Sequence, residues 1–295
     1  MPTLRIGDVQ ISRIEESHGP GFRASMLLPA FNLDAVDNHG PDVFRHFMQL
    51  DTQATLLSVH TWVLRTPRSL ILVDTCTGNH KERPSLPSMH MLQTPYLERL
   101  AAAGVAPDDV DFVVSTHLHV DHVGFNTTLR DGRWVPMFPN ATYLMNRTEF
   151  DFWNPTNPAN AAFAFNAGVF ADSVAPCFEA DQVRLWSGTY ALDEVFHLFE
   201  TPGHTPGNAA AWLHSKDRWA LFSGDNMHSP MQVFEPSWNS AFDFDGRQAE
   251  RTRRAILETC AERDACLLAA HFPAPHVFKV VRRGNGLAAV AALSA

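Results

Sequence analysis

The spacing of apolar and polar residues along the chain predicts many short strands and fewer helices. Apolar or alternating runs rich in Val, Leu, Ile and Thr are typical of strands. The predicted strands are residues 4–6, 9–14, 54–65, 69–74, 110–114, 141–145, 183–186, 194–199, 209–213, 219–222 and 277–281. Helical spacing predicts helices over residues 95–103, 147–153, 158–170 and 247–261. Strands and helices follow each other in two similar halves, which indicates an α/β fold.

The segment from residue 17 to 50 shows neither spacing. Gly, Pro, Asn and Asp are interspersed there with large apolar residues such as Phe22, Met26 and Phe44. Long irregular segments of this kind often form lids or binding loops. We expect residues 1–50 to form an N-terminal hairpin followed by a loop that borders a cleft or makes a homodimer contact, unless the loop simply packs on its own core. No linker interrupts the chain, so we expect a single domain over residues 1–295.

Four metal-binding side chains crowd into six positions directly after the apolar run at residues 110–114. The sequence there, at residues 117–122, is His-Leu-His-Val-Asp-His. Neutral imidazoles and carboxylates are ligands that suit zinc and similar ions. A polar surface turn is the alternative interpretation, but further candidate ligands occur later in the chain. The pattern therefore predicts a metal site at the end of a strand.

The later candidate ligands each lie in a rigid loop or follow an apolar run. His204 lies in a loop stiffened by Pro and Gly. Asp225 follows the run at residues 219–222, and His271 follows the run at residues 267–270. Each of them alone is more often structural. Together with the first cluster they supply enough ligands for two metal ions.

These motifs resemble those of the metallo-β-lactamase-fold hydrolases over residues 55–281. The resemblance implies a four-layer αββα sandwich with a metal site at the edge between its two sheets. The ligands it implies for the first metal are His117, His119 and His204. Those for the second metal are Asp121, His122 and His271, with Asp225 bridging both ions. Asp74 is expected to support the site by hydrogen bonding to a ligand.

The resemblance also implies the chemistry: a dinuclear, metal-dependent hydrolase in which a metal-bridging hydroxide attacks the substrate. The expected ions are two divalent metals, zinc foremost, with Mn, Fe or Co also compatible. Asp121, Asp225 and His228 are the expected catalytic residues. His228 is expected at the wall of the cleft; the alternative is that it contacts a ligand carboxylate.

The expected substrate is a small molecule with an ester-type bond. A His three residues after Asp225, and the His271-Phe-Pro sequence, resemble the branch with methyl-parathion hydrolase, lactonases and esterases. A lactone, an aryl ester or a phosphotriester would fit that branch. A glyoxalase II-like thioesterase and a mononuclear iron dioxygenase remain as alternatives, and so does a binding protein with a vestigial site. Asp225 argues against β-lactamase activity, because those enzymes usually have Cys there.

Aromatic residues flank the candidate ligands, as in many pockets for small ligands. The candidate pocket residues are Phe125, Trp153, Phe234 and Phe272. Any one of them can equally be a core residue.

Charge and composition narrow the possible partners and compartment. The formal net charge is −9, and the chain has no run of Lys and Arg, so we expect no nucleic-acid partner. No apolar stretch is long enough to cross a membrane, and the first residues do not resemble a signal peptide. The four cysteines show no Cys-x-x-Cys spacing. This favours a cytoplasmic protein without a zinc ribbon.

Overall fold

The computed structural model describes residues 3–292 and divides into two compact units. Unit 1 comprises Met1–Ser17 and Val59–Thr189, and unit 2 comprises His18–Ser58 and Tyr190–Ala295. The residue ranges of two long strands, β2 (Val9–Arg23) and β3 (Ala54–Arg65), include residues of both units. The expectation of a single domain stays a prediction.

The sheet of unit 1 has seven strands in the order β1-β2-β3-β4-β5-β8-β9. Besides β2 and β3, its strands are β1 (Leu4–Ile6), β4 (Leu70–Val73), β5 (Phe112–Val114), β8 (Thr142–Asn146) and β9 (Val183–Trp186). From β4 to β9 all neighbours are parallel. All four residues of β4 are buried, as expected of a strand covered on both faces. The carboxyl ends of β4 and β5 therefore lie at the same edge of the sheet.

Helices and a small hairpin complete unit 1. The helices are α4 (Tyr96–Ala102), α5 (Arg147–Trp153) and α6 (Ala175–Glu179), and the hairpin is β6 (Thr127–Arg130) and β7 (Arg133–Pro136). Short 3₁₀ turns occur at Pro87–Met89, Pro107–Asp109, Gly124–Asn126, Pro158–Ala162 and Ala164–Asn166, and a π-helical turn at Phe170–Val174. The core of this unit joins residues of the sheet, such as Val63, Leu72 and Val113, to Tyr96 and Leu100 of α4.

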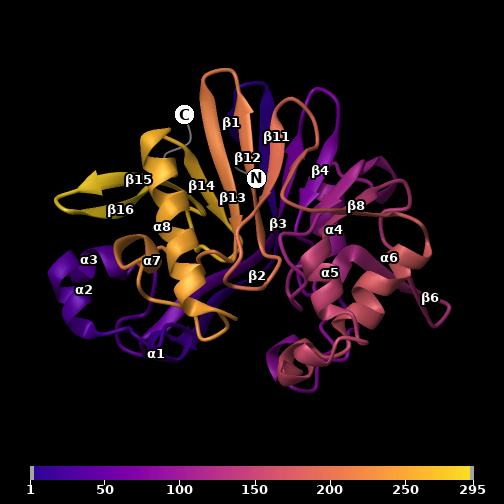
Figure 1. The fold of residues 1–295 in the computed structure, drawn as a ribbon, viewed down its shortest axis with the longest axis horizontal. Coiled ribbons are helices and arrows are strands. Elements are labelled where there is room, and N and C mark those ends of the chain that lie inside the picture. The colour runs from indigo at the N-terminus through magenta and orange to yellow at the C-terminus, as the bar shows by residue number, and fades with distance from the viewer. Residues whose placement is uncertain (1–2, 293–295) are drawn as a thin grey trace. The chain divides into compact units, whose positions relative to one another are not determined.

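The sheet of unit 2 runs in the order β10-β11-β12-β13-β14-β15-β16. Its strands are β10 (Thr189–Ala191), β11 (Phe196–Glu200), β12 (Ala209–Ser215), β13 (Arg218–Gly224), β14 (Cys266–Ala269), β15 (Val277–Arg283) and β16 (Gly286–Ala291). Strands β13 and β14 pair in parallel, whereas the pairs from β11 to β13 and from β14 to β16 are antiparallel. The helices are α1 (Ala24–Leu27), α2 (Leu33–His39), α3 (Pro41–Phe44), α7 (Met231–Phe234) and α8 (Gly246–Glu262). Figure 1 shows α8 in front of the strands β13 and β14.

Residues 17–50 are not an irregular loop, so that expectation was wrong. Strand β2 continues to Arg23, and α1, α2 and α3 occupy much of the remainder. Phe44 is fully buried in the core of unit 2 together with Leu27 and Leu28. Tertiary burial thus stabilises helices of only four to seven residues, which are too short to show a clear period in the sequence. Whether the segment forms a lid or a dimer contact stays a prediction.

The continuous helix expected over residues 158–170 is also absent. Two 3₁₀ turns, Pro158–Ala162 and Ala164–Asn166, lie there instead, and Gly168 follows with a φ of +82°. Phe163, with a φ of −104° and a ψ of 62°, leaves the helical region between the two turns. The left-handed Gly168 then ends the helical backbone beyond them. The hairpin β6–β7 was missed, although Asp131-Gly132 at its turn is a strong hairpin signal. The last strand of the sheet in unit 2, β16, ends at Ala291, and residues 293–295 lie outside the described residues.

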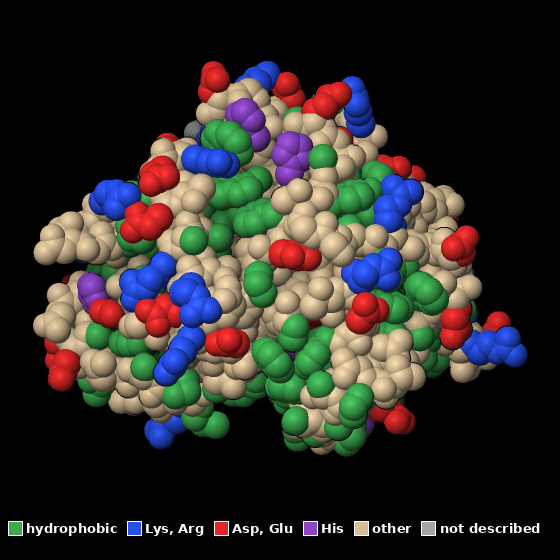
Figure 2. Space-filling model, viewed as in Figure 1, with side chains coloured by type: hydrophobic (Ala, Val, Ile, Leu, Met, Phe, Trp, Pro, Cys, Tyr) green, Lys and Arg blue, Asp and Glu red, His purple; other side chains and the backbone are tan. Residues whose placement is uncertain are grey.

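None of the helices within residues 3–292 is long and apolar enough to cross a membrane. All four cysteines are buried and free. Burial raises the pKa of the Cys76 thiol well above its usual value, so this thiol is a poor nucleophile. On the face shown in Figure 2, basic and acidic side chains are intermixed.

A buried cluster of charges lies within unit 1, away from the candidate metal ligands in sequence. Lys81 is fully buried. It donates to Thr127 Oγ1 at 2.6 Å and to the Asp172 carbonyl at 2.9 Å, and it lies 3.4 Å from the centre of the Trp134 ring. Arg83 binds the Asp172 carboxylate with both terminal nitrogens, at 2.7 and 2.8 Å. Burial lowers the pKa of Lys81 to about 8, although Asp172 opposes the shift.

This pKa predicts how Lys81 affects stability as pH rises. Below pH 8 Lys81 is charged in both states, and the folded protein bears the full cost of burying the charge. Between about pH 8 and 10.5 only the unfolded chain holds the proton, so the contribution of Lys81 to the free energy of unfolding rises by about 2–3 kcal/mol. Denaturant melts at pH 7.5, 9 and 10.5 measure the free energy of unfolding. Over this range the value for wild type should rise relative to that for Lys81→Met. The exposed Lys216→Met variant should show no such trend, and a constant difference for Lys81→Met would contradict the assigned pKa.

Candidate metal centre

The candidate ligands of unit 1 follow strand β5 and are tightly clustered. His117, His119 and His122 are 0–5% exposed. The His117 ring centre lies 4.5 Å from that of His119 and 4.0 Å from that of His122. Asp121 is the most accessible of the group, with 16% of its side chain exposed. Three converging imidazoles and a carboxylate have the donor chemistry of a zinc site.

Asp74 fixes the orientation of two of these imidazoles. It lies at the end of β4, with a φ of +56°, and its Oδ2 is 2.9 Å from His122 Nδ1. Thr116 donates its hydroxyl to Asp74 Oδ2 at 2.9 Å, and its Oγ1 lies 3.2 Å from His117 Nδ1. Because the Thr116 proton is already donated, the hydroxyl accepts from His117. Both imidazoles therefore carry their proton on Nδ1, which leaves Nε2 available to a metal.

Glu149 organises the surroundings of His119 and was missed from the sequence. It is 1% exposed, and its Oε1 accepts from the Leu118 backbone at 3.1 Å and from Trp153 Nε1 at 2.6 Å. The Trp153 ring thus lies edge-on to His119, with ring centres 5.2 Å apart, and Phe165 contacts His119 at 5.1 Å. The four-residue spacing of Glu149 and Trp153 on a helix was the available signal.

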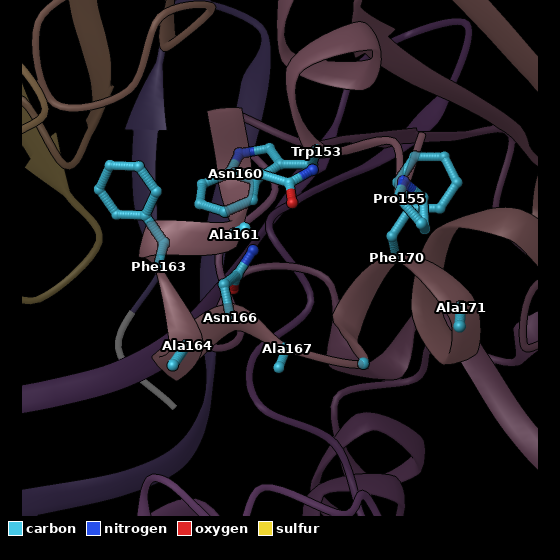
Figure 3. Close-up of a pocket in the computed structure, with 11 residues that line it drawn as sticks. Trp153, Pro155, Asn160, Ala161, Phe163, Ala164, Asn166, Ala167, Phe170 and Ala171 are labelled. Atoms are coloured by element: carbon cyan, nitrogen blue, oxygen red, sulfur yellow. The ribbon is translucent and has the colours of Figure 1, made fainter. Parts of the chain in front are cut away.

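Trp153 also lines a small cavity next to the ligand motif. The cavity has a volume of about 200 Å³ and is lined mainly by aromatic and alanine side chains, among them Phe163 and Ala164 (Figure 3). Asn166 donates from Nδ2 to the carbonyl of Leu118 at 3.0 Å, so the cavity wall is tied to the backbone of the His-x-His-x-Asp-His motif. Trp153 therefore both contacts His119 and lines the cavity.

The other three aromatic residues expected in a pocket are packed in the cores. Phe125 is 3% exposed and stacks on Tyr96 at 4.1 Å. Phe234 packs against Phe44 and Phe47, and Phe272 is fully buried against Phe278. Their part in binding a substrate stays a prediction.

Asp225 is the centre of the candidate ligands in unit 2. It follows β13 and is 3% exposed, while His271 follows the parallel strand β14. Its carboxylate oxygens lie 3.1 Å from His271 Nε2, 3.2 Å from His228 Nε2 and 3.5 Å from His204 Nε2. The ligand atoms of His204, Asp225 and His228 all lie within 4.8 Å of one another. Such a group of buried nitrogen and oxygen donors fits a divalent cation.

The two ligand histidines of unit 2 are also oriented through Nδ1. His204 Nδ1 lies 3.0 Å from Asp243 Oδ1, and His271 Nδ1 lies 3.0 Å from the carbonyl oxygen of Ser58. Both oxygens accept from Nδ1, and Nε2 of both imidazoles is turned toward the Asp225 carboxylate. Burial of Asp243 acts to raise its pKa, but the hydrogen bond with His204 lowers it, and the net effect is a lowered pKa. The sequence did not identify Asp243 or Ser58 as partners, because each lies far from its histidine along the chain.

His228 lies among the ligands of unit 2. It is 6% exposed, its Nε2 contacts Asp225, and its backbone N–H donates to Gln232 Oε1 at 2.7 Å. Burial lowers its pKa, although Asp225 opposes the shift, so His228 favours the neutral form that can bind a metal. Of the two roles expected from the sequence, this geometry favours contact with a ligand carboxylate.

His228→Ala should therefore weaken metal binding rather than lower turnover alone. We expect the dissociation constant for Zn²⁺ to rise about 10-fold or more, because a neighbour of Asp225 is lost. Competition with a chelator dye measures it, and the exposed His197→Ala variant is the control. Wild-type zinc affinity together with reduced turnover would instead place His228 at the wall of a substrate cleft.

Comparison with known proteins identifies relatives among lactonases. An N-acyl homoserine lactonase from Bacillus thuringiensis is 25% identical over 179 residues, which are 56% of this chain and 62% of that protein. The N-acyl homoserine lactonase AttM from Agrobacterium fabrum is 27% identical over 122 residues, 38% of this chain and 39% of the relative. The chain thus spans less than two thirds of the length of these curated relatives.

Solved structures and a family model agree on the fold. The hydrolase AbOPH of the beta lactamase superfamily superimposes with a TM-score of 0.80 at 24% identity, covering 98% of this chain and 96% of its own. AidC, a dizinc quorum-quenching lactonase, gives a TM-score of 0.76 at 20% identity over 99% and 97% of the two chains. The model of the metallo-beta-lactamase superfamily matches residues 54–271. The metallo-β-lactamase fold implied by the sequence motifs is confirmed, and the chain belongs to the metallo-β-lactamase superfamily.

Proposed function

We propose that this protein is a metal-dependent hydrolase of small ester-type substrates that binds two divalent ions. One observation carries the proposal. Four of the five candidate ligand histidines have Nδ1 within 3.2 Å of an oxygen that accepts its proton. Metal-binding histidines are usually oriented in this way by a partner on the other ring nitrogen, so the arrangement supports a metal site.

We assign seven ligands, as the motifs imply. His117, His119 and His204 would hold the first ion, Asp121, His122 and His271 the second, and Asp225 would bridge them. Nitrogen and oxygen donors without a thiolate favour zinc, with Mn, Fe or Co compatible. When bound, such ions supply Lewis acidity and lower the pKa of water so that it can attack near neutral pH.

The side chains of the protein orient the ions and manage protons. Asp74 and Asp243 keep His122 and His204 in the Nδ1-protonated form. Asp121, which is partly exposed, is the carboxylate best placed to exchange a proton with a substrate or leaving group. His228 would add positive charge beside Asp225 only when protonated, and its burial opposes that.

The names of the relatives and the apolar cavity support this substrate class. The curated relatives are named as N-acyl homoserine lactonases. The cavity beside Trp153 would accept a small apolar substituent. A lactone with a small apolar substituent would meet both conditions, and an aryl ester or a phosphotriester with such a substituent would fit the cavity.

Metal analysis and a substrate panel test the proposal. Protein loaded with Zn²⁺ or Mn²⁺ should hold about two ions per chain and hydrolyse at least one of a set of lactones, aryl esters and phosphotriesters. One iron per chain would favour a dioxygenase, and hydrolysis of only a glutathione thioester would favour a glyoxalase II-like enzyme. A protein that binds no metal would refute the proposal.

Asp225→Asn should remove activity by weakening both ions. The substitution keeps the shape of the side chain but loses the charge that faces three imidazoles. We expect the metal content to fall to one ion or fewer and turnover to fall about 100-fold or more. Elemental analysis and initial rates measure the two effects, with the exposed Asp217→Asn variant as control. Retention of both ions and of the rate would show that Asp225 is not the bridge.

Filling the cavity should change selectivity but not the chemistry. Ala164→Leu would place a larger side chain in the space next to Trp153. We expect kcat/KM for substrates with large apolar substituents to fall about 10-fold relative to small ones, because one or two lost methylene contacts have about this effect. Ala159→Leu, exposed in the same segment, is the control. An equal change for large and small substrates would mean that the cavity does not bind the substituent.

A further inference from the structure

Arg253 is a fully buried arginine near the middle of α8. Its guanidinium makes polar contacts in several directions. Nε donates to the Asn226 carbonyl at 2.8 Å, and one terminal nitrogen donates to the Pro236 carbonyl at 2.6 Å and to Asn239 Oδ1 at 3.2 Å. The other terminal nitrogen lies 3.3 Å from Asp243 Oδ2.

Two of these contacts are with neighbours of candidate ligands. Asn226 is the residue after Asp225, so Arg253 holds the backbone from which the Asp225 side chain projects. Asp243 bonds to Arg253 through Oδ2 and to His204 Nδ1 through Oδ1. One guanidinium therefore reaches two ligands, each through a single intermediate residue.

Other residues of α8 contact the loop that carries His204. Thr252 donates its hydroxyl to the Pro202 carbonyl at 2.8 Å. A Cβ on Gly203 would lie 2.3 Å from the backbone nitrogen of Ala249, so the loop and the helix are in direct contact. Asp245, the residue before α8, donates from its backbone N–H to the Gly203 carbonyl at 2.9 Å. The helix is thus a rigid support for the loop that carries His204.

A buried arginine is expensive unless its hydrogen bonds are satisfied. Burial lowers the pKa of Arg253, and Asp243 opposes the shift. The surrounding carbonyl oxygens and a single carboxylate match the planar fork of a guanidinium, which the compact ammonium of lysine does not reproduce. An apolar residue would fill the volume without this cost if packing were the sole requirement.

We propose that Arg253 is a positioning residue that sets the geometry of His204 and Asp225 for metal binding. It acts on His204 through Asp243 and on Asp225 through the backbone of Asn226. The inference rests on the proposed function, because it assigns Arg253 a role toward the metal centre.

Conservative substitution of two neighbouring arginines tests the role. Arg253→Lys keeps the charge but loses the fork, whereas Arg254→Lys changes an exposed residue paired with Glu250. Chelator competition with Zn²⁺, and the visible absorption bands of Co²⁺-loaded protein, report on the site without any assay of activity. We expect Arg253→Lys to raise the metal dissociation constant about 10–100-fold and to change the Co²⁺ bands. Arg254→Lys should match wild type in both.

A double-mutant cycle tests the path through Asp243. If Arg253 acts on His204 through Asp243, the double variant Arg253→Lys/Asp243→Asn should lose less metal-binding free energy than the sum of the losses in the two single variants. Fully additive effects would exclude this path. Should Arg253→Lys fail to fold, Asp243→Asn still tests the path, because it weakens both contacts of Asp243 while keeping the shape of the side chain. Wild-type metal affinity in that variant would overturn the proposal.

The outcomes separate this inference from the proposed function. If wild type binds neither Zn²⁺ nor Co²⁺, the proposed function fails. If wild type binds both ions and Arg253→Lys binds them equally well with unchanged Co²⁺ bands, the inference alone fails. A lower melting temperature with unchanged affinity would likewise make Arg253 a purely structural residue.

Discussion

The candidate centre depends on which nitrogen of each imidazole carries the proton. A neutral histidine can bind a metal through Nε2 only if its proton is on Nδ1, and a neighbouring acceptor decides this. Here the acceptors are side-chain and backbone oxygens from other parts of the chain, such as Asp74, Asp243 and the Ser58 carbonyl. The fold must therefore deliver a set of oxygens as well as the set of ligands. This second requirement explains much of the polar burial in both units.

The direction of the strands brings these groups together in each unit. In unit 1 the parallel pair β4 and β5 ends with Asp74 and the His-x-His-x-Asp-His motif at one edge of the sheet. In unit 2 the parallel pair β13 and β14 ends with Asp225 and His271. The chain leaves β4 in a left-handed conformation at Asp74 and leaves β13 through Gly224, whose φ is +49°. This left-handed backbone bends the chain at the end of each strand, where a side chain is no longer packed between neighbouring strands.

The sequence predicted the features that depend on local spacing of residues, and few of those that depend on long-range contacts. Most strands and the helix α5 occur where hydrophobic spacing placed them, and the family match confirmed the fold. The short helices α1 to α3 were missed because their stability comes from burial of residues such as Phe44 and not from helical spacing. Asp243 and Glu149 were missed for another reason. Their importance lies in contacts with His204 and with Leu118, 39 and 31 positions away, which no local pattern encodes.

Helix α8 shows that a signal was nevertheless present. Helical spacing predicted a helix over residues 247–261, and its buried face comprises Ala249, Ile256, Leu257 and Cys260 together with Arg253. A charged residue at a core position costs free energy unless its partners are also brought inside. The helical position of Arg253 therefore implies a buried set of acceptors from the spacing of residues alone. What the sequence could not supply was their identity, because the oxygens of Asn226, Pro236 and Asp243 come together only once the loops after β13 have folded against the helix.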